Sequence, residues 1–163
     1  MARGNEIVVT SEPHGRFLEG KLKTGITPKP GTILQPQVAT AIDSNGRWTF
    51  ELAAPDATGG RPKGPICILL ADWGQGKLAT DAYADSANVR CYVPQAGDEL
   101  NLLLLDIAGT ADDHAIGEIL IFHATNGKLV ATTGSPECEP FMLLETITDP
   151  AADTLAHVIY TGY

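Results

Sequence analysis

Cysteines, aromatic rings and long apolar runs are all scarce in this sequence, and each scarcity excludes a class of protein. Three cysteines occur among 163 residues, an odd number without a CxxC pair, so no disulfide framework of a secreted protein is indicated. No stretch approaches the ~20 apolar residues that a membrane-spanning helix needs. Residues 1–6 lack the apolar core of a signal peptide. We therefore expect a soluble chain, synthesised in a cytoplasm, with no membrane partner.

The cysteines that are present are expected to be inert. Cys67 and Cys91 lie in apolar, strand-like runs, so we interpret them as small buried hydrophobic residues. Cys138 lies between two glutamates and is expected to be exposed, where neighbouring anions disfavour a reactive thiolate. This usage fits a reducing compartment.

Basic residues are also few, since 11 Lys and Arg stand against 20 Asp and Glu, a formal net charge of −9. A field of that sign repels the phosphates of DNA and RNA. The composition therefore predicts no nucleic-acid partner, whereas a neutral or basic protein partner stays open.

Signals for catalysis and for a cofactor are missing. Residues 73–77 contain two glycines and a lysine, but Leu78 follows where a phosphate-binding loop has Ser or Thr. No GxSxG-like elbow presents a nucleophile. The four histidines are scattered along the chain, at His14, His114, His123 and His157. We predict no catalytic residues and no cofactor, so the chain is not expected to be an enzyme.

A compact group of possible metal ligands occurs at Asp112, Asp113 and His114. Adjacent side chains on an extended chain point in alternate directions, so three in a row rarely converge on one ion. No second ligand group has a recognisable spacing to it. We interpret the group as part of a solvated loop and predict no metal; a weak cation site is the alternative.

Strands separated by turns dominate what is present. Period-two alternation and Asn-Gly turns predict two hairpins, one joining 38–42 to 47–52 and one joining 118–123 to 128–132. Further strands are predicted at 65–70, 88–93, 99–105, 141–148 and 155–163. Nine or ten strands at spacings near ten residues, with 17 Gly and 11 Pro at the corners, predict an all-β, mainly antiparallel barrel or sandwich.

The first thirty residues differ from the rest, because prolines and glycines are too dense for a helix. We predict an extended N-terminal arm over 1–30 and a single β-rich domain over 31–163. The arm is interpreted either as a flexible terminus or as a segment that becomes ordered against a neighbouring subunit or a shell. The apolar residues chosen as its contacts are Ile7, Val8 and Val9, followed by Phe17 and Leu18.

Two stretches resemble the head-decoration (capsid cement) proteins of tailed bacteriophages. The first is the Pro-x-Pro-Gly-Thr segment at 28–32, within 23–34. The second runs from a strand at 67–71 and a glycine-rich turn at 74–76 to 81–84, 89–94 and 97–101. With the C-terminal hairpin, the resemblance covers about residues 20 to 163. The family usually has a glycine in the turn before the Val-x-Val-type strand, and residues 85–88 occupy that turn here.

The resemblance implies a small β-barrel or β-tulip domain that forms a homotrimer on the outer capsid surface. Such trimers bind the major capsid protein at threefold or quasi-threefold sites and stabilise the expanded shell. The expected location is therefore the virion. An adhesive or carbohydrate-binding β-module of a virion fibre or cell-surface assembly is the alternative, with Trp73 as the credible platform for a sugar, and an enzyme is the third hypothesis.

Overall fold

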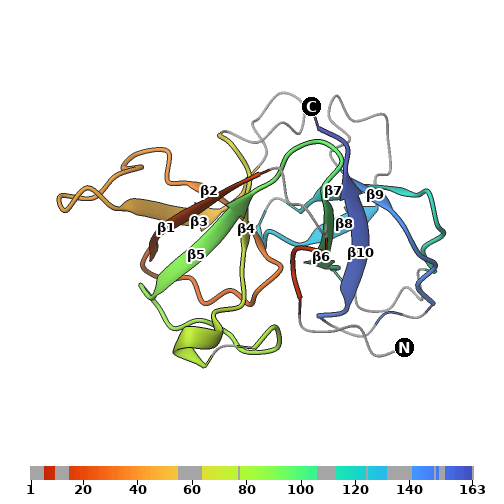
Figure 1. Cartoon of the computed structure of the whole chain (residues 1–163), viewed down its shortest axis with the longest axis horizontal. Coiled ribbons are helices and arrows are strands. Elements are labelled where there is room, and N and C mark those ends of the chain that lie inside the picture. Colours follow the sequence, from red (N-terminus) through yellow and green to blue (C-terminus); the bar gives the residue numbers. More distant parts are fainter. Residues whose placement is uncertain are drawn as a thin grey trace.

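The computed structural model describes residues 6–9, 15–54, 64–76, 78–105, 113–123, 125–131, 141–148, 150 and 153–162. These residues form two β-bodies that lie side by side along the long axis of the molecule (Figure 1). The only helix among them is a single 3-10 turn, η1 (Trp73–Gln75).

The first body is a closed five-stranded barrel. Its strands, in spatial order, are β1 (Arg16–Leu22), β3 (Trp48–Leu52), β2 (Ile33–Pro36), β4 (Cys67–Leu69) and β5 (Asn88–Val93). All neighbours pair antiparallel except β1 and β3, which are parallel. Alternate residues point inward and form the barrel core, which consists of Leu22, Leu34, Phe50, Cys67, Leu69, Tyr83, Val89 and Cys91.

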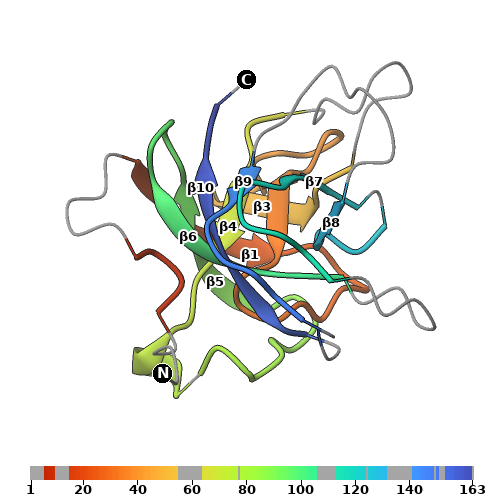
Figure 2. The same cartoon turned by 90° about the vertical axis from the view of Figure 1, so that its right-hand side faces the viewer.

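The second body is a five-stranded sheet, which faces the viewer in Figure 2. Its spatial order is β6 (Glu99–Leu103), β10 (Leu155–Tyr160), β9 (Phe141–Leu143), β7 (Ile119–Phe122) and β8 (Leu129–Ala131). Residues 7–9 cover the edge of β6, because Ile7 O accepts from Asn101 N at 2.8 Å and Val9 N donates to Glu99 O at 2.9 Å. Such covering protects a sheet edge from pairing with other chains.

The larger core lies between the two bodies. Ile33, Ile68 and Tyr92 turn outward from the barrel and pack against the inner face of the second sheet. The Tyr92 hydroxyl donates to the buried Asp98 carboxylate at 2.5 Å and accepts from Gly15 N at 2.7 Å. Burial, together with the hydrogen bond to Asp98, raises the pKa of Tyr92 to about 12. The start of β1 is thereby attached to the turn between β5 and β6.

Two connecting segments fasten the barrel to the sheet. Gly31 N donates to Leu69 O at 2.8 Å in the barrel, and Leu103 N donates to Gly31 O at 3.1 Å from the sheet. From the other side, the turn between β7 and β8 reaches β2, where Ile33 N donates to Gly127 O at 2.7 Å. The two bodies therefore share backbone hydrogen bonds as well as a core.

An ion-pair cluster closes the same junction at the surface. Asp153 accepts hydrogen bonds from Lys128 at 2.5 Å and from Lys29 at 2.7 Å. The hydrogen bonds from Lys128 and then Lys29 lower the pKa of Asp153 below its ordinary 3.8, against a smaller opposing effect of burial. One lysine comes from each body, so Asp153 links them electrostatically.

Acid is expected to remove the contribution of Asp153 to stability. Its pKa is lower in the folded chain than in the unfolded chain, so the contribution is complete above pH 3.8 and is lost as the pH falls through the lower folded value. Replacing Asp153 with Asn is therefore expected to cost about 1 kcal/mol of unfolding free energy at neutral pH and almost nothing in strong acid. Urea unfolding of both proteins at about pH 7, 5 and 3 measures the difference. A difference that stays constant over that range would contradict the role given to Asp153.

The predicted all-β, mainly antiparallel class is confirmed, and so is closure into a small barrel. The predicted strand over 88–93 coincides with β5, and the Asn126-Gly127 turn connects β7 and β8 as the second predicted hairpin. Cys67 and Cys91 are fully buried, as predicted. Burial raises the pKa of the Cys67 thiol to about 12 and that of Cys91 well above its ordinary value.

Two predictions need correction. Residues 16–22, assigned to the arm, form β1, which pairs with β3 and β5 and buries Leu22 completely. The predicted strand over 38–42 is also wrong, since the antiparallel partner of β3 is β2, at 33–36, and 38–42 contributes one isolated bridge from Ile42 to Trp48. Cys138 lies outside the described residues.

Candidate docking hairpin on the barrel

Residues 37–47 form a projecting hairpin, which we call the docking hairpin. It lies at the barrel end of the long axis, away from the second sheet (Figure 1). Its turn closes with Gly46 N donating to Asp43 O at 2.9 Å and Asp43 N donating to Arg47 O at 2.8 Å. Gly46 has a φ of +76°, a left-handed conformation that glycine adopts without strain.

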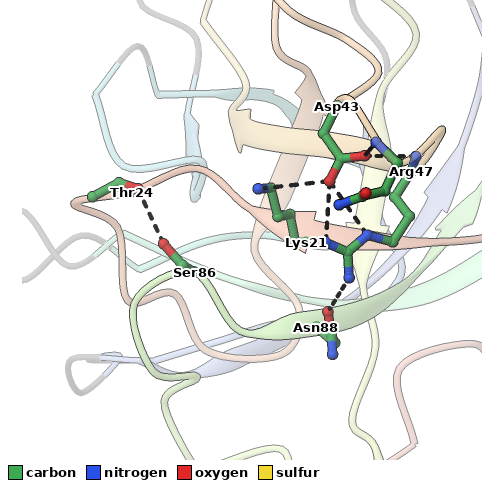
Figure 3. Close-up of polar contacts among 7 residues, drawn as sticks. Lys21, Thr24, Asp43, Arg47, Ser86 and Asn88 are labelled. Atoms are coloured by element: carbon green, nitrogen blue, oxygen red, sulfur yellow. Dashed lines mark hydrogen bonds and ion pairs between the residues drawn. The ribbon is translucent and has the colours of Figure 1, made fainter.

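Asp43 braces the tip of the docking hairpin (Figure 3). Its carboxylate accepts hydrogen bonds from Asn45 N and Arg47 N, both at 2.9 Å, and from the Arg47 guanidinium at 3.1 and 3.3 Å. Lys21 on β1 lies 3.6 Å from the same carboxylate. The backbone N–H of Arg47 is the main cause that lowers the pKa of Asp43 below its ordinary value. Asp43 therefore remains charged at neutral pH and keeps the turn attached to β1.

The base of the docking hairpin is braced by Glu51. Its carboxylate accepts from Lys23 at 3.0 Å, and from Gln35 Nε2 and Val38 N at 3.2 Å each. Partial burial raises the pKa of Glu51, but these hydrogen bonds outweigh it and lower the pKa overall. Arg47 also reaches β5, where Nη1 lies 3.5 Å from Asn88 Oδ1 (Figure 3). The hairpin is thus held to several strands.

The docking hairpin exposes two large aliphatic side chains. Val38 is 64% exposed and Ile42 is 52% exposed. Exposed aliphatic residues are ordinary when they stand alone. Two of them on one braced hairpin offer a preorganised apolar contact, because little conformational entropy would be lost when a partner binds there.

Hollows lie on both sides of the docking hairpin. The larger, about 480 Å³, is lined by Glu19, Gly20, Arg47, Asp72, Gln75, Asn88, Val89 and Arg90. The smaller, about 370 Å³, is lined by Lys21, Leu22, Lys23, Thr24, Gln37, Thr40, Asp43 and Thr49. Across the rim of the smaller hollow, the hydroxyls of Thr24 and Ser86 are 3.1 Å apart (Figure 3). We call the larger hollow the barrel groove.

An aromatic and cationic contact adjoins the barrel groove on β1 and β5. The guanidinium carbon of Arg90 lies 4.6 Å from the centre of the Phe17 ring, and Phe17 also packs against Tyr92, with ring centres 5.2 Å apart. Glu19 is the register partner of Arg90 across the two strands. Aromatic rings and arginines are enriched where proteins bind one another.

The structure separates the five predicted contact residues. Ile7 is buried in the main core, so its predicted contact with a shell is corrected, whereas Leu18 packs against the barrel core and is partly exposed. Val8 packs partly against the main core. Val9 and Phe17 are exposed, at 37% and 45%. Ile7 is therefore structural, and a contact through Val8, Val9, Phe17 or Leu18 stays a prediction.

The residues considered for metal binding do not converge. His114 is buried and lies 3.0 Å from Glu118, whereas Asp113 is exposed and Asp112 lies outside the described residues. His157 lies 2.9 Å from Glu99, and His123 contacts Thr125. Within the described ranges, no three His, Cys, Asp or Glu side chains are grouped to hold a metal. No helix in that part of the chain could cross a bilayer.

Charge is divided unequally along the sequence. Residues 1–93, which end with β5, contain ten basic and nine acidic side chains, a net charge of +1. Residues 94–163 contain one basic and eleven acidic side chains, a net charge of −10. The signal is present in the sequence but needs the boundary at β5 to be recognised.

Comparison with known proteins adds no family. No protein-family model matches the sequence, and a search of curated proteins returns no match.

Proposed function

We propose that this chain is a non-enzymatic structural protein that binds the outer surface of a phage capsid, itself built from the major capsid protein, as a homotrimer. The proposed sites are threefold or quasi-threefold positions of the expanded shell, which places the protein on the virion. The resemblance of 28–32 to the head-decoration family supports the proposal.

The observation that carries the proposal is the docking hairpin. It is rigid because Asp43 and Glu51 tie it to neighbouring strands, and it exposes Val38 and Ile42 at the end of the molecule. Residues 1–93, which include the hairpin, carry a net charge of +1, and residues 94–163 carry −10. With a net charge of −9, bound copies of the chain would keep virions dispersed.

The mechanism is thermodynamic linkage. A protein that binds the expanded shell more tightly than other states of the lattice stabilises that shell by the free energy of binding. Each contact is small, but a trimer that spans several capsid subunits multiplies it. Separating those subunits then requires the trimer to dissociate first.

Co-sedimentation with shells tests the proposal. Purified chain is mixed with expanded and unexpanded capsids of the encoding phage, both lacking this chain, and the bound fraction is measured up to about 10 µM. Saturation of the expanded shell at a multiple of three copies per binding site, with little binding to the unexpanded shell, is expected. Absence of binding to expanded capsids would refute the function.

A second candidate is a carbohydrate-binding module, favoured by the lining of the barrel groove. Glu19 offers an acceptor, and Asn88 and Arg90 offer donors, a mixture that suits neutral sugar hydroxyls. Titration of the chain with neutral oligosaccharides at millimolar concentration, followed by amide NMR, separates the candidates. Shifts confined to groove residues and lost in Asn88→Ala would favour the sugar; unchanged spectra would exclude it.

A further inference from the structure

A hollow of about 330 Å³ lies at the junction between the barrel and the second sheet. Residues of 25–32 and 125–128 line it, and β3 and β6 reach it through Leu52 and Leu103. Ligand sites are common at such junctions, where apolar walls are combined with a few convergent polar groups. We call this hollow the junction pocket.

The apolar part of the junction pocket is made by four side chains. Pro28 and Leu103 are buried, whereas Ile26 and Leu52 are partly buried against the barrel core. Leu52 comes from the barrel and Leu103 from the second sheet, so both bodies contribute to the walls. A hydrocarbon group that lies against these walls is removed from water, which favours its binding.

The charged part of the junction pocket is the cluster of Lys29, Lys128 and Asp153. The two lysine side chains, 35% and 23% exposed, share the single Asp153 carboxylate at 2.7 and 2.5 Å. Among the described residues that line the pocket these three are the charged ones, and two ammonium groups with one carboxylate give a net charge of +1. One lysine would already neutralise Asp153. The second lysine therefore adds a partly buried positive charge in excess, which is costly unless an anion matches it.

The two ammonium groups also have hydrogen-bond donors in reserve. Each carries three N–H donors, and among the described residues each donates to Asp153 alone. Because they hold the two oxygens of one carboxylate, both lie within reach of one further small anion. A second carboxylate that accepts from both would neutralise the cluster through charge-assisted hydrogen bonds, which are stronger than neutral ones.

We propose that the junction pocket binds a small monocarboxylate with an aliphatic body. Lys29 and Lys128 donate to the ligand carboxylate beside Asp153, and the aliphatic body packs against Leu52 and Leu103. The net charge of +1 matches a monoanion better than a phosphate dianion, and the apolar walls favour an organic anion over an inorganic one. The site is separate from the docking hairpin, so the inference does not depend on binding to a shell.

Amide NMR of the full chain with sodium hexanoate tests the proposal, at about pH 7 and in about 50 mM NaCl to limit screening. Saturable shifts confined to amides of the pocket lining are expected, with a Kd of about 1 mM for a ligand of this size. From acetate through butyrate to hexanoate, each added CH₂ is expected to tighten binding about twofold to fourfold. Hexanol, which lacks the charge, and inorganic phosphate, which lacks the aliphatic body, are expected to bind at least about tenfold more weakly than hexanoate.

Three results of this titration would overturn the proposal. One is the absence of saturable shifts up to about 20 mM hexanoate. Another is a set of shifts spread over the surface instead of grouped at the pocket. The third is hexanol or phosphate binding as tightly as hexanoate, because the charged cluster and the apolar walls would then not act together.

Substitutions in the charged cluster make the test specific. Lys128→Met keeps the aliphatic stem but removes the ammonium group, and it is expected to weaken hexanoate binding about tenfold. Asp153→Asn removes the competing carboxylate and raises the net charge of the cluster, so it is expected to tighten binding severalfold. Arg16→Met is the matched control, since it removes one positive charge at an exposed position of β1 outside the pocket, and it is expected to leave binding unchanged. Circular dichroism verifies that each variant folds.

The signs of these changes separate a ligand site from a purely structural ion pair. Unchanged binding in Lys128→Met, or binding in Asp153→Asn that is not tightened, would refute a carboxylate held by the two lysines. An equal loss in Lys128→Met and Arg16→Met would also refute it, because the net charge of the whole chain would then account for the effect.

Discussion

A chain that lacks residues 1–22 is expected not to form the barrel. The deletion removes β1, which lies between β3 and β5 and contributes three and six register pairs to them. It also removes Leu22 from the barrel core. Closed barrels lose both their hydrogen-bonded closure and part of their core when one strand is absent. Far-UV circular dichroism and thermal unfolding measure the outcome, with loss of a cooperative transition expected.

Deletion of residues 1–5 alone is the matched control for that experiment. It retains Ile7, β1 and the Tyr92–Asp98 network, so a cooperative transition close to that of the full chain is expected. A stable, cooperative fold in the longer deletion would contradict the assignment of β1 to the barrel. It would instead support a detachable arm.

Gly127→Ala is expected to destabilise the protein by about 2–4 kcal/mol, as the sum of two effects. Gly127 has a φ of +64°, where a side chain costs energy. A Cβ at this position would lie 2.4 Å from Ile33 O and 2.9 Å from Thr32 Cγ2, so the turn would have to leave β2. Urea unfolding measures the loss.

The first hairpin offers a control with the same turn chemistry. Gly46 also follows an asparagine and has a φ of +76°, but a Cβ there would meet nothing within 4 Å. Gly46→Ala is therefore expected to cost only the backbone term, about 1 kcal/mol. Equal losses in the two variants would show that the Gly127 turn does not press against the barrel.

The fold could be predicted where local pattern decides structure. β5 alternates cleanly over 88–93, and the Asn-Gly turns specify tight hairpins whatever surrounds them. The leucine-rich run at 99–105 was ambiguous by pattern, and its strand conformation followed from its length and its boundaries. The apolar, strand-like runs around Cys67 and Cys91 predicted that both cysteines are buried.

The first strand could not be predicted because its evidence is not local. β1 contains Gly20 and lies among glycines and prolines, which resemble a loop by composition. Gly20 is needed because a Cβ would lie 2.3 Å from Trp48 O on the parallel neighbour β3. A parallel pairing between segments nearly thirty residues apart produces no recognisable pattern in the sequence of either segment.

The docking hairpin was only half predictable. Its turn was predicted from Asp43 and Asn45-Gly46, but Val38 and Ile42 were assigned to a strand because they alternate with small residues. Those side chains are exposed because β2 ends at Pro36 and because Glu51 accepts a hydrogen bond from Val38 N. Both features depend on tertiary contacts.

The most direct test of the account compares apolar side chains on the two bodies. The double variant Val38→Ser with Ile42→Ser removes the exposed aliphatic surface of the docking hairpin, and Ile116→Ser removes an equally exposed residue of the sheet body. Affinity for expanded capsids is measured by co-sedimentation. The double variant is expected to bind about tenfold to a hundredfold more weakly, while the control binds as the unmodified chain does. Unchanged binding of the double variant, in a folded protein, would contradict docking through the hairpin.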